Sequence, residues 1–576
     1  MHQHHTRQLF LRLVSFLFFV AFASLYIQWD GLFGTDGMEP ASVMLRSKSQ
    51  ATFRQFPSLL AFHDTFHLPL DVFAEGLLVV GMCLSLLAAS FPTQCAILPV
   101  MLGIQYAYLA FYKVGGTFLS FQWDILLLET GWLACAWSPW WPKQKASTAV
   151  QYLLRFLVFK LMFMSGVVKI QANCPTWIGL TALNYHYATQ CLPTPLAWYA
   201  HQLPPLVQQM SVAACLIIEI PAAFLLISPL RSGRVVGVAL QAVLQVLILL
   251  TGNYNFFNLL TMVLCLPCVD DDVWWVGKGE EEGKVYLQDS QTSQSQTSKG
   301  KRKGKKKGKE KPLAHPSSLT SSLKKGQEGE AAPVEHPSLL HSFDVSGVLS
   351  SFHALTAYMD AQHPIATVIL FVVLPLSCSA WWMIGVAGDG TLRLKVTVAQ
   401  TNQLLDGYLP YLLLVVCVVT GLQCMQEVVD AVGNCGQAVR AGVWDGCRTR
   451  TSDHDNGNNG SNDDGNSDET QQQQEEELRL QRRRTACWCT CGQSIVLSLL
   501  RVSRAVFTCG CVVLLLATTS VTFVGVSRPI QAKVPAYAWD LYSATSAHAL
   551  SSSYGLFRRM TGVGDQKQVA RPEITL

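Results

Sequence analysis

The sequence predicts an all-α protein, built as a polytopic transmembrane helix bundle with disordered loops. Half of its 576 residues are hydrophobic and only 14% are charged, whereas charged residues make up about 25% of ordinary soluble domains. Apolar runs near the roughly 20 residues that cross a bilayer as a helix recur along the chain. Most of the charge collects in blocks between these runs. The composition therefore excludes an ordinary soluble globular domain.

The first element is an apolar stretch from Leu9 to Ile27, which Arg7 and Arg12 flank. A cleavable signal has an apolar region of about 7–15 residues, followed by a small-residue cleavage site. This stretch is longer, and its exit reads YIQWDG. We therefore interpret residues 9–27 as a signal anchor and first span in preference to a cleaved signal.

Further apolar stretches extend the bundle to about 9–11 spans. The shortest of them are 95–112 and 254–268, and 495–526 is long enough for a tilted helix. After the first span, the candidates are 74–91, 95–112, 121–141, 150–169, 206–228, 234–252, 254–268, 365–386, 408–426 and 495–526.

Two low-complexity segments separate these spans into blocks. Runs rich in Ser, Gln, Lys and Gly, or in Asn, Asp and Gly, bury too little apolar surface to fold. The predicted divisions are an N-terminal membrane domain of about eight spans (1–268), a mostly disordered basic cytosolic loop (269–364), two further spans (365–426), a low-complexity loop (427–494), the last span (495–526) and a lumenal tail (527–576).

The basic residues predict the orientation of the bundle, because Lys and Arg are enriched in cytosolic loops. With a cytosolic N-terminus, the block Lys299–Lys311 and the run Arg482–Arg484 both lie in the cytosol. The loop 170–203 has no Lys or Arg and lies on the lumenal side. The same alternation predicts a lumenal C-terminus.

Charged residues inside the predicted spans are the most unusual feature of the sequence. The spans 121–141 and 150–169 are joined by a short loop, so they should be antiparallel neighbours. At about 1.5 Å per residue, Glu129 and Lys160 then lie at the same depth, roughly 12–14 Å below the lumenal end, and are predicted to pair. The pair either fixes helix packing or forms an acid–base or substrate site. The other charged positions of this kind are Asp124, Arg155 and Glu219.

The lumenal loop 170–203 is rich in proline and aromatic residues, so it cannot form one continuous helix. Its aromatic side chains suit the membrane–water interface. His201 and His186 have no spacing typical of a metal site, and no metal ligand set is predicted. The residues that we expect to contact a folding client are Trp177, Tyr185, His186, Tyr187, Trp198 and His201.

Cysteines suggest two modifications. Cys174 and Cys191 lie near the two ends of the lumenal loop, on the oxidising side, and are candidates for a disulfide. Cys487, Cys489 and Cys491 follow a basic run and precede the last span, which is typical of palmitoylation.

The sequence carries no nucleotide, dinucleotide, serine-hydrolase or zinc-protease motif, and no cofactor is predicted.

Several phrases resemble the lipase maturation factor family. They are GLFGTDGMEPA after the first span, FQWDILLLE at 121–129, CPTWIGLTALNYHYATQCLPTPLAWYAHQLP at 174–204, TGNYNFFNLL at 251–260 and SSYGLFRRMTGVG at 552–564. The resemblance covers most of 1–268 and, more loosely, 340–430 and 490–564. The chain departs from the family at Ala188, where relatives often have Glu, and after Gly564, where they continue into a lumenal domain. That second departure predicts a shortened C-terminus.

The resemblance implies a multi-pass protein of the endoplasmic reticulum membrane. Its expected role is chaperone-like: folding, assembly and export of secreted clients such as lipoprotein lipase, without catalysis. The expected partners are secretory clients and the lipid bilayer, and not nucleic acid. The membrane part also looks similar to that of vitamin K-dependent carboxylase, so a membrane enzyme using Lys160 and Glu129 is one alternative, and a transporter is another.

Overall fold

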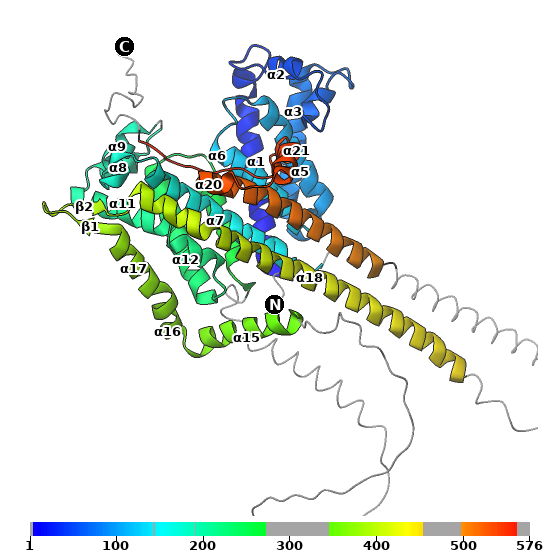
Figure 1. Cartoon of the computed structure of the whole chain (residues 1–576). Coiled ribbons are helices and arrows are strands. Elements are labelled where there is room, and N and C mark those ends of the chain that lie inside the picture. The colour runs from blue at the N-terminus through cyan, green and yellow to red at the C-terminus, as the bar shows by residue number, and fades with distance from the viewer. Residues whose placement is uncertain are drawn as a thin grey trace, which may run out of the picture. The chain divides into compact units, whose positions relative to one another are not determined.

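The computed structural model describes residues 4–141, 144–190, 192–271, 345–452, 496 and 498–560. Residues 1–271 and 349–576 cluster as one unit, and residues 272–348 as another. The contacts described below lie within the first unit. The described part of the chain is helical apart from one short hairpin and connecting loops (Figure 1), so the all-α prediction is confirmed.

The N-terminal half contributes most of the long helices. Its elements are α1 (His4–Leu32), α2 (Ala41–Ser47), η1 (Leu59–Phe62), α3 (Leu70–Ser90), α4 (Pro92–Cys95), α5 (Leu98–Val114), α6 (Gln122–Trp137), α7 (Thr148–Gln171), α8 (Pro175–Ile178), α9 (Ala182–Thr189), α10 (Pro195–His201), α11 (Pro205–Glu219), η2 (Ala222–Ile227), α12 (Arg231–Thr251), α13 (Phe257–Cys265) and η3 (Leu266–Cys268).

The C-terminal half adds fewer elements, and α15 begins in the second unit. They are α15 (Val345–Gln362), α16 (Pro364–Val368), η5 (Ile369–Val373), α17 (Leu374–Met383), β1 (Ile384–Val386), β2 (Leu392–Leu394), α18 (Val398–Ser452), a helix over Ser498–Val526 that ends in η6 (Val524–Val526), α20 (Arg528–Gln531) and α21 (Ala536–Ser546). The strands β1 and β2 pair in antiparallel register, with Ile384 opposite Leu394.

Among the described residues, seven helices are long and apolar enough to span a membrane, which confirms a multi-pass protein. They are His5–Leu32, Leu70–Ser90, Pro205–Ile227, Arg231–Thr251, Pro364–Met383, Val398–Gly433 and Ser498–Val526. The other predicted spans coincide with α5, α6, α7 and α13. Of these, α5 and α6 are slightly shorter than a typical span, with 17 and 16 residues.

Helix α7 forms the centre of the unit. It is buried around its whole circumference, and it packs against α6, α11, α13, α18 and η2. Rings of Phe156, Phe159 and Phe163 continue into Phe224 of η2 and Phe523 of the Ser498–Val526 helix. Two of the charged residues on α7, Lys160 and Lys169, are therefore buried in the protein.

Helices α6 and α7 are antiparallel, as the short loop between them predicts. Trp137 at the end of α6 donates a hydrogen bond from Nε1 to the carbonyl of Ser147, just before α7 begins, over 3.0 Å. Ser147 caps α7 through its hydroxyl, which accepts from the Val150 amide over 3.2 Å. A hydroxyl at this position satisfies one of the free amides of the first turn. The start of α6 therefore lies at the same end as the end of α7.

Two segments differ from the expected loops. Helix α18 continues past residue 426, where the predicted loop 427–494 begins, and ends at Ser452. Residues 427–452 contain no proline and include several good helix formers, so nothing interrupts the helix there. Within the predicted loop 269–364, α15 is helical from Val345 onward. Both helices thus extend into segments that the sequence analysis assigns to loops.

After α21 the chain crosses the bundle as a non-helical segment, residues 548–560, here called the C-terminal strap. Ala549 and Phe557 adopt φ values of 51° and 52°. Side chains rarely adopt such positive φ angles unless neighbouring contacts hold them. The contacts that hold the strap come from α6, α7 and the loop 170–203, and they define the site described next.

Candidate functional site

A buried ion pair joins α6 to α7. Lys160 Nζ lies 2.6 Å from Glu129 Oε1, and the two side chains are 0% and 2% exposed. Lys160 also donates to Ser551 Oγ over 3.2 Å. The carboxylate is thus held in the interior by a direct, charge-assisted hydrogen bond. The structure brings the two side chains into direct contact.

The other oxygen of Glu129 holds the C-terminal strap. Tyr554 donates from its hydroxyl to Oε2 over 2.6 Å, and the Ser552 amide donates to the same atom over 3.0 Å. The Lys160 ammonium lies 5.1 Å from the centre of the Tyr554 ring. Both oxygens of the buried carboxylate are therefore occupied, one by a helix and the other by the strap. Nothing in the sequence indicated these strap partners.

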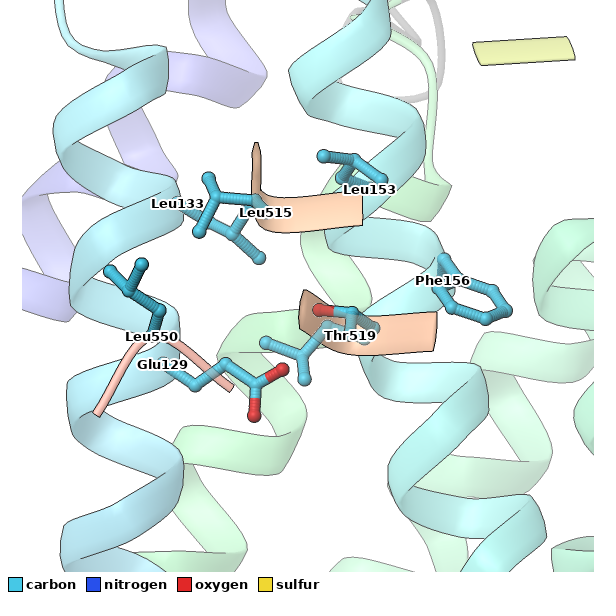
Figure 2. A pocket seen from close by; sticks show the side chains of 8 residues that line it. Glu129, Leu133, Leu153, Phe156, Leu515, Thr519 and Leu550 are labelled. Atoms are coloured by element: carbon cyan, nitrogen blue, oxygen red, sulfur yellow. The ribbon is translucent and has the colours of Figure 1, made fainter. Parts of the chain in front are cut away.

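The surroundings of Glu129 leave little space. A cavity of about 10 Å³ next to it is lined mainly by leucines of α6, α7 and the Ser498–Val526 helix. Figure 2 shows the Glu129 carboxyl group beneath Leu133, Leu153 and Leu515, with Thr519 beside it. Such a volume holds about one water molecule. The described cavity at the ion pair is therefore too small for a substrate.

A second ion pair, which the sequence did not reveal, lies at the end of α7. Lys169 donates to both carboxylate oxygens of Glu219 on α11, and their side chains are 1% and 6% exposed. The Lys169 ammonium also lies 5.0 Å from the centre of the Trp177 ring. The sequence marks Glu219 as an intramembrane charge and indicates no partner for it. The structure supplies that partner from α7 and adds an aromatic ring from the loop.

The remaining intramembrane charges are also bonded. Arg155 donates to the Pro267 carbonyl over 2.7 Å and lies 3.3 Å from Asp270, which pairs with Arg234 over 2.6 Å. At the opposite end of the bundle, Tyr108 donates to Asp124 over 2.6 Å. Each of these contacts ties one helix to another element. The structure therefore separates the charges into local contacts and does not gather them into one acidic or basic centre.

Part of the loop 170–203 folds against the strap. Trp177, which is 4% exposed, donates from Nε1 to the Phe557 carbonyl over 2.9 Å. His186 Nε2 lies 3.0 Å from the Tyr254 hydroxyl. The Phe557 ring stands edge-on to both rings, 5.2 Å from that of His186 and 5.3 Å from that of Tyr254. Three of the phrases that carry the family resemblance thus meet in this aromatic cluster.

Burial lowers the pKa of His186 to about 4, and the nearby Lys169 ammonium adds to the effect. Because the folded-state pKa lies below the ordinary value of 6.5, protonation favours the unfolded state, and stability falls as pH drops below about 6.5. We expect wild-type protein to lose roughly 2 kcal/mol between pH 7 and pH 5 from this group. Thermal unfolding of wild type and His186→Gln across this range measures it. An unchanged pH slope in the variant would contradict the assignment.

The rest of the loop faces outward. Trp198 and Tyr199 on α10 are 64% and 65% exposed. Leu196 is exposed beside them, and Tyr185 on α9 is exposed as well. His201 and Tyr187 are half-buried. The six residues that we expected to contact a client therefore divide into an inward group around Trp177 and His186 and an outward group around Trp198.

The predicted modification sites are only partly described. Cys174 is buried, with its Sγ 3.2 Å from Thr176 Oγ1, and Cys191 lies outside the described residues. Cys487, Cys489 and Cys491 also lie outside them. Within the part of the chain that the structure describes, no group of three or more His, Cys, Asp or Glu side chains could hold a metal ion.

Comparisons with known proteins concern the N-terminal half. Residues 5–276 match the family described as lipase maturation factor transmembrane domain. Lipase maturation factor 2 of Xenopus laevis is 46% identical over 277 residues, which cover 46% of this chain and 39% of that protein. Human lipase maturation factor 2 is 44% identical over 286 residues, covering 46% and 40%. Human lipase maturation factor 1 is 31% identical over 280 residues, covering 46% and 48%.

The aligned part of the chain spans about two fifths of the length of the lipase maturation factor 2 relatives. No solved structure shows a significant match. The matched range includes the two buried ion pairs, and it also includes His186 and Tyr254. The C-terminal strap lies beyond it. The identity is greater to lipase maturation factor 2 than to lipase maturation factor 1. Residues 5–276 are thus similar to the transmembrane domain of the lipase maturation factor family.

Proposed function

We propose that the protein is a chaperone-like maturation factor of the endoplasmic reticulum membrane, which assists the folding, assembly and export of secreted lipases. The observation that carries this proposal is the match of residues 5–276 to the lipase maturation factor transmembrane domain. The printed names of the relatives refer to lipase maturation. In our proposal the N-terminus is cytosolic and the loop 170–203 is lumenal.

The outward face of α10 is the proposed client contact. Leu196, Trp198 and Tyr199 form an exposed aromatic edge, here called the α10 edge. Large aromatic side chains supply much of the binding energy at protein interfaces. A partly folded client exposes apolar surface that such an edge can cover. The inward half of the same loop, held by Trp177 and His186, gives the edge a fixed support.

We propose that the Glu129–Lys160 pair supports the structure and is not a catalytic site. Both carboxylate oxygens are bonded inside the protein, and the cavity beside them holds about one water. A general base must come within hydrogen-bond distance of the proton that it removes. Tyr554 and Thr522 contact the pair and also line a larger cavity, so they stand between the two. This arrangement favours a maturation factor over a membrane enzyme.

Secretion measures the proposal directly. In secretory cells that lack the gene, we expect active secreted lipase to fall and to return on re-expression of the wild-type chain. A Trp198→Ala, Tyr199→Ala double variant should restore it poorly, because loss of aromatic contacts weakens binding by roughly tenfold or more.

A matched control removes exposed aromatics elsewhere. Tyr408 and Tyr411 on α18 are 69% and 68% exposed, so a Tyr408→Ala, Tyr411→Ala variant should restore secretion like wild type. Normal lipase output in the cells without the gene would contradict the proposed function. Equal failure of both double variants would contradict the role of the α10 edge.

A further inference from the structure

A second and much larger cavity lies on the other side of Tyr554 and Thr522. Its volume is about 500 Å³, within the range of about 300–1,000 Å³ typical of small-molecule sites. Residues of α6, α7, the Ser498–Val526 helix, α20, α21 and the strap line it. This cavity is separate from the small one next to Glu129, and no role described above uses it.

The position of the cavity matches a membrane–water boundary. It is lined by Gln122, the first residue of α6, by Gln171, the last residue of α7, and by Val526, where the last long helix ends. Figure 1 shows α20 directly beyond the end of that helix. Met164, also in the lining, lies about 10 Å further into the bundle at 1.5 Å per residue. The cavity thus runs from the polar helix ends into the apolar zone.

The chemistry of the lining changes along the same direction. The deeper wall is apolar and includes Met164, Val168 and Val521. The outer wall carries hydrogen-bonding groups: Gln122, Gln171, Gln531, Ser553 and Arg558. Arg558 is the one charged side chain among the described residues that line the cavity. Such a lining suits a molecule with an apolar chain and a negatively charged polar head.

We propose that this cavity binds one anionic phospholipid. The phosphate lies at Arg558, the rest of the head group meets the amide side chains at the rim, and an acyl chain extends along α7 and the Ser498–Val526 helix. Arg528 and Lys533 flank the lining residue Gln531 in the sequence and carry further positive charge, which favours a negative head group. Because Ser553, Tyr554, Gly555 and Arg558 belong to the strap, a bound lipid also holds the strap against the bundle.

A glycine allows the cavity to be filled without disturbing its walls. Gly525 lines the cavity, and a Cβ built there meets no atom within 4 Å. Gly525→Phe therefore places a ring in the open space. Gly510 on the same helix also has no atom within 4 Å of a Cβ, and it is not among the lining residues. Gly510→Phe is thus the matched control for added bulk.

Thermal unfolding of the detergent-purified full chain tests the proposal. Short-chain phosphatidylglycerol should raise the unfolding midpoint more than short-chain phosphatidylcholine does, because a ligand that binds only the folded state stabilises it. Arg558→Gln should weaken the response about tenfold in lipid concentration, as expected for loss of a charge-assisted contact. Gly525→Phe should abolish it. Arg559→Gln and Gly510→Phe should respond like wild type.

Three results would overturn the proposal. An equal rise of the unfolding midpoint with phosphatidylcholine would show that the site does not select a negatively charged head group. An equal shift with inorganic phosphate alone would show a site for free anions and not for a lipid. An unchanged response in both Gly525→Phe and Arg558→Gln would place the lipid elsewhere. None of these outcomes depends on lipase secretion, so failure here is distinguishable from failure of the proposed function.

Discussion

Replacing Lys160 with Met is expected to destabilise the protein by about 3–5 kcal/mol, because it leaves the Glu129 carboxylate buried without its cation. Methionine keeps much of the side-chain volume, so the change removes charge more than packing. Glu129 would retain only the Tyr554 hydroxyl and the Ser552 amide among its present donors. The expected result is a lower unfolding midpoint and a smaller monodisperse fraction after detergent extraction.

A double-mutant cycle measures the interaction energy between Glu129 and Lys160 apart from the other effects of each substitution. Glu129→Gln with Lys160→Met removes both charges, and it should be less destabilised than the two single losses added together. A charge swap is a weaker test, because the strap offers two donors to residue 129, which suit a carboxylate and oppose an ammonium. Simple addition of the two single effects would contradict the pairing energy that we assign.

Stability and lipase output of the double variant together distinguish a structural role of Lys160 from a catalytic one. If Lys160 holds the bundle together, the neutral double variant should recover lipase output in cells along with stability. If Lys160 acts as a base, the double variant should fold and still fail to restore output. The first outcome is expected from the bonded, nearly closed surroundings of the pair.

The sequence could predict the Glu129–Lys160 contact because the relevant geometry is local. A short loop forces two neighbouring helices to be antiparallel, and helical rise then converts residue number into depth. The strap partners could not be predicted in this way. Tyr554 is 425 residues from Glu129 in the chain, and a non-helical segment has no periodicity from which its depth follows. Long-range contacts of this kind depend on the whole fold.

The Lys169–Glu219 pair shows a second limit. Lys169 lies at the last turn of α7, where a basic residue is ordinarily explained by the helix end or by the interface. Glu219 lies at the end of α11, and the loop 170–203 separates the two helices in the chain. The length of that loop leaves the relative depth of its flanking helices open. The sequence therefore identified the acid as unusual and missed its partner.

Replacing Lys169 with Met is expected to loosen the lumenal loop as well as to destabilise the protein. The change leaves Glu219 buried and uncompensated, which costs about 3–5 kcal/mol, and it removes the cation beside the Trp177 ring. Trp177 anchors the strap through the Phe557 carbonyl. Backbone amides of residues 173–190 should therefore exchange hydrogen faster than in wild type, by about tenfold for each ~1.4 kcal/mol of local stability lost.

The control uses a lysine with similar aromatic geometry. Lys395 lies 5.0 Å from the centre of the Trp381 ring, as Lys169 does from Trp177, but on an exposed surface. Lys395→Met should leave exchange in 173–190 unchanged, and adding Glu219→Leu to Lys169→Met should restore part of the protection. Unaltered exchange in Lys169→Met would contradict the coupling of this ion pair to the loop. The α10 edge belongs to the same loop. If the Lys169–Glu219 pair holds that loop in place, lipase output should be lower with Lys169→Met than with Lys395→Met.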